Sequence, residues 1–69
     1  MEYTNSQIRK LIDEHIHSLR DRWILYDRLI DGMKFESLAE KYELSPRQVR
    51  NIVYKCEEIL FRKIPENFP

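Results

Sequence analysis

The scarcity of chain-breaking residues is the strongest constraint on the fold of this sequence. Before residue 65 the chain contains one glycine, Gly32, and one proline, Pro46. In the segments before, between and after these two residues, apolar residues recur at spacings of three and four, which is the pattern of amphipathic helices. A chain of 69 residues supports one small core. We therefore expect a single all-α domain over residues 1–63 and a flexible tail over residues 64–69.

Local signals divide the chain into helices. We expect four, at about residues 5–17, 19–31, 35–42 and 46–62. Asn5 or Ser6 is available to cap the first helix, and Ser18 followed by Asp21 fits a capping box that starts the second. Gly32 is expected to end the second helix in the left-handed conformation, which glycine adopts without a Cβ clash.

The best local signal is the run Ser45-Pro46-Arg47-Gln48. It combines a capping Ser, a Pro at the first helical position and a Gln three residues after the cap, each suited to the unpaired amides of a helix start. The last helix is therefore predicted to begin at Pro46. Its apolar stripe is expected to face the core and consists of Val49, Ile52, Val53, Cys56 and Leu60.

Several other side chains have a default position. We expect the aromatic residues Trp23, Tyr26 and Tyr42 in the core, and we interpret Asp27 and Asp31 as surface residues that pair with a neighbouring Arg. Another two, Ile24 and Phe61, fall outside the expected apolar stripes of their helices. Either the tail folds back over Phe61 or these two residues form a partner surface, and we favour the partner.

Charge is balanced overall but unevenly distributed. Twelve basic and twelve acidic residues give a net charge of zero. Residues 1–44 have a net charge of −2, whereas residues 45–63 have a net charge of +3. The positive charge therefore lies in the segment of the last expected helix.

The face of this helix opposite its apolar stripe carries hydrogen-bond donors suited to DNA. Arg can bind a guanine edge and Asn or Gln an adenine edge, and a helix fits the major groove. We expect Arg47, Gln48, Arg50 and Asn51 to read bases, and Tyr54 and Lys55 to contact phosphates. Gln48 has a competing role, because it is also the capping-box residue that pairs with Ser45.

The spacing of Phe35 to Ile52 resembles the helix-turn-helix signature of DNA-binding regulators. Ala39 matches its small residue, and Leu44 matches its apolar turn residue. With the segment before it, the chain from about residue 19 to 61 more narrowly resembles region 4 of bacterial sigma factors and the small stand-alone sigma-region-4-like proteins of phages. Two positions depart from that family: Glu43 stands where Gly is usual, and Lys34 stands where a Ser or Thr cap is usual.

These features predict a sequence-specific, DNA-binding regulator of transcription with double-stranded DNA as its partner. The resemblance implies RNA polymerase as a second partner, and a second copy of the chain is a candidate for a homodimer. Two alternatives stay open: a helical adaptor or anti-repressor that binds proteins, and a phage packaging or replication protein with the same helix pair. We expect no enzymatic activity, no cofactor, no metal, no membrane segment and a cytoplasmic location.

Overall fold

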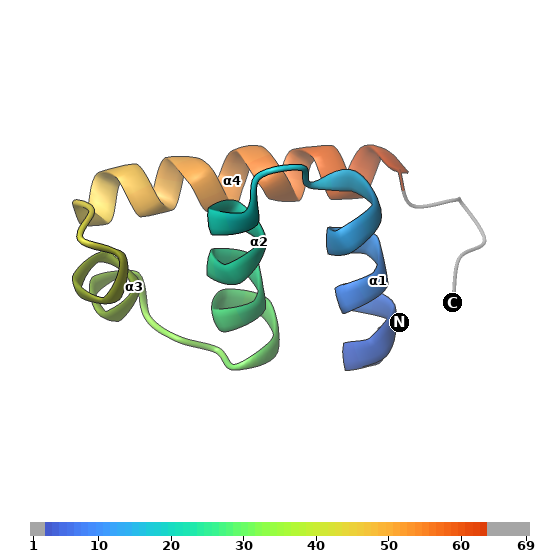
Figure 1. Ribbon diagram of the computed structural model, residues 1–69, viewed down its shortest axis with the longest axis horizontal. Coiled ribbons are helices and arrows are strands. Elements are labelled where there is room, and N and C mark those ends of the chain that lie inside the picture. Colours follow the sequence, from blue (N-terminus) through green and yellow to red (C-terminus); the bar gives the residue numbers. More distant parts are fainter. Residues whose placement is uncertain (1–2, 64–69) are drawn as a thin grey trace.

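A long C-terminal helix forms the axis of the molecule, and the other helices pack against it. The computed structural model describes residues 3–63. Its elements are α1 (Asn5–His15), α2 (Leu19–Leu25), η1 (Tyr26–Ile30), α3 (Phe35–Tyr42) and α4 (Pro46–Lys63). Within this part of the chain every regular element is helical, so the all-α prediction is confirmed (Figure 1). The predicted tail, residues 64–69, lies outside the described residues.

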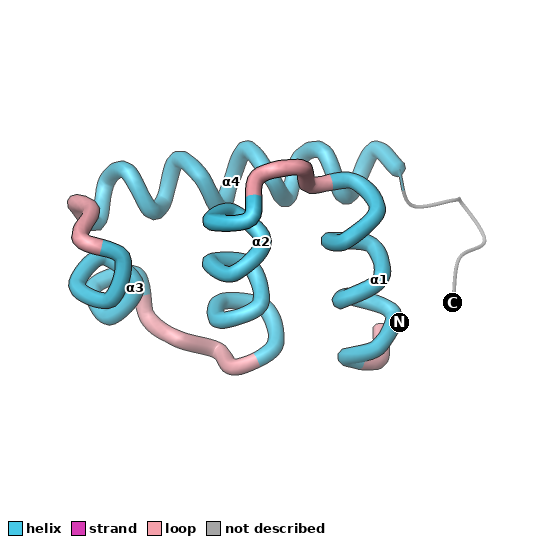
Figure 2. Tube along the Cα trace, viewed as in Figure 1, coloured by secondary structure: helices cyan, strands magenta, loops and turns pink. Residues whose placement is uncertain are grey.

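Each of the three earlier helices contacts a different part of α4. Figure 1 shows α3 beside the beginning of α4, α2 beside its middle and α1 near its C-terminal end, and contacts link α4 to each of them. The loops between the helices are short (Figure 2). No helix within residues 3–63 is long and apolar enough to cross a lipid bilayer.

One core joins all four helices. Its buried members from the first three helices are Leu11, Ile12, Ile16, Ile24, Leu25, Leu38 and Ala39, and those from α4 are Val49, Val53, Cys56 and Leu60. The expected apolar stripe of α4 is thus buried, with Ile52 partly buried at its edge. Apolar residues two turns apart along α4 face different neighbours, so a single stripe holds three helices together.

The first helix starts at the predicted residue, Asn5, but its cap and its end differ from the prediction. Thr4 is the cap, because its hydroxyl accepts a hydrogen bond from the Gln7 amide (3.1 Å) and the Gln7 side chain accepts one from the Thr4 amide (2.8 Å). This reciprocal arrangement satisfies two amides at once, which neither Asn5 nor Ser6 does here. The helix ends at His15 instead of residue 17, because Ile16 is extended and buried.

The second helical segment changes its geometry part of the way along. Ser18 caps it with half of the predicted capping box, because its hydroxyl accepts from the Asp21 amide (3.3 Å) while the Asp21 carboxylate accepts from the Arg20 guanidinium (3.3 Å) instead of the Ser18 amide. From Tyr26 to Ile30 the backbone widens into a π-helical turn, in which the Asp31 amide donates to the Tyr26 carbonyl (3.2 Å). The predicted left-handed residue after this segment, Gly32, has φ 72°. A continuous α-helix over residues 19–31 was therefore wrong in its second half.

The α3–α4 connection agrees with the local signals. Three residues join α3 to α4, and the first of them, Glu43, has φ 56° and ψ 44°, the left-handed conformation. The Leu44 amide donates to the Ala39 carbonyl (2.9 Å), which satisfies a carbonyl left unpaired at the end of α3. Leu44 also packs against the core, so the turn is held from the inside.

Candidate nucleic-acid interface

The beginning of α4 is fixed by its cap. The Ser45 hydroxyl accepts from the Gln48 amide (3.1 Å), and the Gln48 side-chain oxygen accepts from the Ser45 amide (2.9 Å). This confirms the predicted capping box. In the free protein the cap therefore occupies the Gln48 side-chain oxygen, which two-point binding of adenine would also need, and base reading by Gln48 stays a prediction.

The remaining predicted residues share one exposed surface of α4, which we call the outer face. Its members are Arg47, Arg50, Asn51, Tyr54 and Lys55, all of them exposed. The apolar stripe on the opposite side is buried under the other helices. A helix with one face in the core and the other in solvent can enter a groove without rearrangement of the fold.

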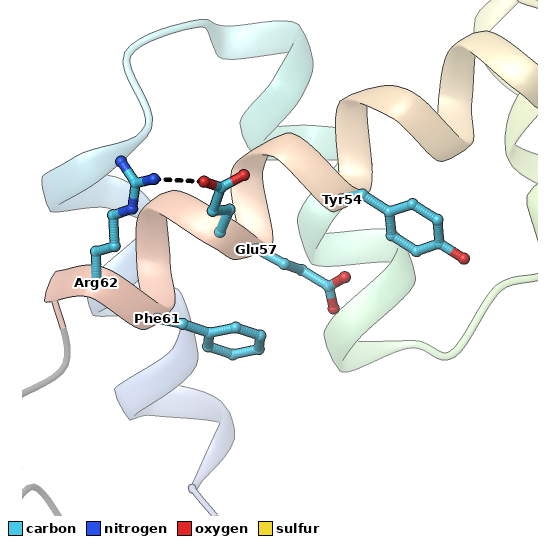
Figure 3. Close-up of a pocket in the computed structure, with 5 residues that line it drawn as sticks. Tyr54, Glu57, Phe61 and Arg62 are labelled. Atoms are coloured by element: carbon cyan, nitrogen blue, oxygen red, sulfur yellow. Dashed lines mark hydrogen bonds and ion pairs between the residues drawn. The ribbon is translucent and has the colours of Figure 1, made fainter.

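Donor groups on the outer face are largely unpaired. Within the described residues no hydrogen bond or ion pair involves the side chain of Arg47, Asn51 or Lys55. Towards the end of α4, by contrast, Arg62 donates to Glu58 at 2.5 Å (Figure 3). The positive charge of α4 is therefore available over its first three turns and partly neutralised beyond them.

Two residues outside α4 also border this surface. The ring of Phe35, at the start of α3, lies edge-on to the Tyr54 ring with centroids 6.0 Å apart. The Arg50 guanidinium carbon lies 5.6 Å from the Phe35 centroid, and the Arg28 guanidinium carbon lies 4.4 Å from it. The sequence analysis missed Arg28 and Phe35 as neighbours of the outer face, because only the chain reversal after Gly32 brings them to α4.

A partly buried ionic cluster, formed by a buried carboxylate and a half-exposed ammonium, joins α3 to η1. Asp27 in η1 is 7% exposed and accepts hydrogen bonds from the Lys41 ammonium (2.8 Å) and the Tyr42 hydroxyl (2.5 Å), both in α3. Its prediction as a surface residue was wrong, because its partners lie across the helix interface and not on its own helix. Burial alone would raise the pKa of Asp27, but the hydrogen bonds from Lys41 and Tyr42 outweigh it, and the pKa is lowered. Burial and the hydrogen bond to Asp27 raise the pKa of Tyr42 well above its usual value.

Of the two residues of the predicted partner surface, one is exposed and the other is buried. Phe61 is 65% exposed and lies beside Tyr54, Glu57, Glu58 and Arg62 around a shallow hollow on α4 (Figure 3). Ile24 is 0% exposed, so its assignment to a surface was wrong. Asp27, three residues later along the same helical segment, is buried as well and has its partners Lys41 and Tyr42 across the helix interface.

Trp23 was also misplaced by the sequence analysis. It is 56% exposed, and Leu19, one turn earlier on α2, is 67% exposed. The expected core position of Trp23 was therefore wrong, while Tyr26 and Tyr42 are partly buried against the core. The Trp23 ring lies edge-on to the Tyr26 ring, with ring centroids 6.0 Å apart.

The single cysteine belongs to the core. Cys56 is buried in the apolar stripe of α4, and this burial raises the pKa of its thiol. A buried, protonated thiol behaves as a small apolar side chain, as the sequence analysis expected.

Comparison with known protein families, curated proteins and solved structures gives no significant match. The residues and geometry described above are therefore the basis for the function proposed below.

Proposed function

We propose that this protein is a sequence-specific DNA-binding regulator of transcription, with α4 as its recognition helix in the major groove. One observation carries the proposal: the first turns of α4 present exposed Arg47 and Asn51 side chains without partners in the described part of the chain. Unpaired guanidinium and amide groups on a capped, core-anchored helix suit two-point contacts to guanine and adenine edges. We assign base reading to Arg47, Arg50 and Asn51, and phosphate contact to Tyr54 and Lys55.

The α3–α4 pair supports a helix-turn-helix of the kind found in region 4 of sigma factors. Glu43 takes the left-handed conformation that Gly usually provides in that turn, at a cost of about 1 kcal/mol. Lys34 precedes α3 without a capping side-chain hydrogen bond, as expected from its departure from the family pattern. The spacing over Phe35 to Ile52 and the packing of Ala39 are both compatible with such a pair.

The proposal is tested by separating base reading from phosphate contact. A duplex selected from a genomic DNA library and a random duplex are each titrated with protein, with fluorescence anisotropy as readout. Arg47→Ala should lose about 1–3 kcal/mol more on the selected duplex than on the random one, because a base contact discriminates between sites and a phosphate contact does not. Lys55→Ala should weaken binding to both duplexes alike.

Lys10→Ala is the matched control for Lys55→Ala. Lys10 is likewise an exposed helical lysine without an ion pair in the described residues, but it lies on α1. This substitution should leave both affinities unchanged. Equal losses on both duplexes in Arg47→Ala and Lys55→Ala would reject the assignment of roles, and a wild-type protein that binds no duplex at low salt would reject the function.

A protein-interaction module is the second candidate, and a specific observation favours it. Leu19 and Trp23 lie one turn apart on α2 and expose most of their apolar side chains. Exposed large apolar side chains on one face are typical of surfaces that bind a partner. Recovery of a defined protein complex that Trp23→Ala abolishes, together with no detectable duplex binding, would establish this function instead. RNA polymerase and a second copy of the chain are partners to test in that experiment.

A further inference from the structure

The Phe35 ring is the only recorded side-chain partner of Arg50 in the described residues. Arg50 is exposed on the outer face and forms no hydrogen bond or ion pair there, but its guanidinium carbon lies 5.6 Å from the ring centroid. Arg47, one turn earlier, has no comparable neighbour. Two arginines of the same helix face therefore differ in how firmly they are held.

The ring itself is held by residues outside α4. Phe35 is partly buried against the core, and the Tyr54 ring meets it edge-on. On the η1 side, the Arg28 guanidinium lies 4.4 Å from the ring centroid and donates to the Met33 carbonyl at 2.8 Å. The Phe35 ring is thus fixed relative to η1, α3 and α4 at the same time.

A contact with an aromatic ring orders a guanidinium without consuming its hydrogen bonds. An ion pair with a carboxylate would occupy the N–H groups that DNA needs, as Glu58 does for Arg62. An aromatic ring attracts the cation through its π-electrons and accepts none of the in-plane N–H bonds. An arginine ordered in this way loses less side-chain freedom when it binds a ligand.

We propose that Phe35 is a positioning residue of the DNA-contact surface, which holds Arg50 in a binding orientation while leaving its N–H groups free. This inference rests on the proposed function for the identity of the ligand. It assigns to α3 a role in recognition beyond support of α4. The expected gain from such a contact at an exposed site corresponds to about two- to fivefold in affinity.

The ordering of Arg50 is tested first in the free protein. NMR relaxation of the arginine Nε–Hε groups should give a higher order parameter for Arg50 than for Arg47 in the wild type. Phe35→Leu should lower the values for Arg50 and for Arg28, which also contacts the ring, and should leave the value for Arg47 unchanged. Phe35→Tyr, which keeps the ring, should retain the wild-type values. Equal values for Arg50 and Arg47 in the wild type would overturn the proposal, and this measurement does not depend on the folding of any variant.

The consequence for binding is tested by a double-mutant cycle on the selected duplex. Phe35→Leu should weaken binding about two- to fivefold in the wild-type background and in an Arg47→Ala background, but not in an Arg50→Ala background. A loss that persists after Arg50 is removed would overturn the positioning role and indicate a structural one. Absence of duplex binding by the wild type would instead overturn the proposed function, while the order parameters would still decide whether Phe35 orders Arg50.

Discussion

Asp27 is the one buried charged residue among the described side chains. The free-energy cost of removing its carboxylate from water is offset by hydrogen bonds from two donors. Its carboxylate accepts from the Lys41 ammonium and the Tyr42 hydroxyl, so η1 and α3 are joined through a charged hydrogen-bonded cluster. Removal of one member of such a cluster leaves the others desolvated without a full set of partners. The position of α3, and with it the start of α4, therefore depends on this residue.

We expect Asp27→Asn to lower the free energy of unfolding by about 2 kcal/mol, because hydrogen bonds to a charged group are lost in a buried setting. Urea denaturation at pH 7 measures the change. Asp31→Asn is the matched control, since Asp31 is exposed and has no side-chain partner in the described residues, and it should change stability by less than about 0.5 kcal/mol. Equal effects of the two substitutions would contradict the role of the cluster.

The same cluster predicts a dependence on acid. The pKa of Asp27 is lower in the folded protein than its unfolded value of about 3.9. Its stabilising contribution should therefore be complete above pH 4 and decline as the pH falls through the folded-state pKa. Denaturation curves of the wild type and Asp27→Asn should be separated at pH 7 and converge towards pH 2. A separation that stays constant down to pH 2 would exclude Asp27 as its source.

Truncation of two neighbouring residues of α2 should lower stability by very different amounts. Ile24→Ala removes a fully buried side chain and should cost about 2–5 kcal/mol. Trp23→Ala removes a larger side chain that is mostly in solvent, so it should cost no more than about 1 kcal/mol, mainly the edge contact with Tyr26. Thermal denaturation of both variants measures this order, and a reversed order would mean that α2 is rotated about its axis.

Which side chains are buried could be predicted for a helix that packs on one side only. It could not be predicted for a helix that packs on several sides. The core stripe of α4 followed from its spacing, because all its partners lie on one side. The α2–η1 segment failed: Trp23 was expected inside, and Ile24 and Asp27 outside. Asp27 and Arg28 have their partners on or near α3, and no local pattern reveals such long-range partners.

At the level of the elements, the turn between α3 and α4 stores backbone strain. Glu43 adopts the left-handed conformation, which a residue with a Cβ reaches only at a cost. Glu43→Gly should raise the free energy of unfolding by about 0.5–1 kcal/mol, because relief of this strain exceeds the added flexibility of the unfolded chain. Guanidinium denaturation measures the gain.

Glu40→Gly provides the control for this substitution. Glu40 is exposed like Glu43 but lies within α3, where glycine weakens a helix by about 0.5–1 kcal/mol. The two glycine variants should therefore shift stability in opposite directions. Destabilisation by both would show that the left-handed turn is not a source of strain.

Helix bounds followed from the sequence wherever a cap is local. The start of α4 at Pro46 and the whole of α3 match the prediction, because Ser45, Gln48 and the Glu43 turn act within a few residues of one another. The early end of α1 and the π-helical turn of η1 have no such signal. The residue after α1, Ile16, is extended and buried, so the end of this helix depends on packing against the rest of the molecule.

On the scale of the whole molecule, a chain with zero net charge can bind DNA only through an uneven surface. The outer face supplies three cations, Arg47, Arg50 and Lys55, without carboxylate partners in the described residues. If each neutralises a phosphate on random duplex, the logarithm of affinity should fall against the logarithm of salt concentration with a slope of about −3.

Anisotropy titrations over a range of salt concentrations measure this slope. Lys55→Ala should reduce its magnitude by about 0.9, whereas Lys10→Ala should leave it unchanged. A slope near zero for the wild type would mean that the outer face does not meet phosphates. Such a result would favour the protein-interaction module.

The candidate site was predictable in part for a physical reason. The outer face belongs to a single helix. Its members could be predicted from the helical periodicity of α4 and from the Ser45 cap that fixes where the helix begins. Phe35 and Arg28 join it only through the fold of the whole chain, which brings η1, α3 and α4 together around one ring.

The two sides of α4 answer to separate requirements. Its apolar stripe packs against three other helices. The side chains of Arg47 and Asn51 are exposed and form no hydrogen bond or ion pair with other described residues. Under the proposed function, substitution of these two residues by others should therefore change the DNA sequence that the protein prefers without destabilising the fold. Under the proposed function, Arg47 and Asn51 are thus positions at which specificity can change without a cost to the fold.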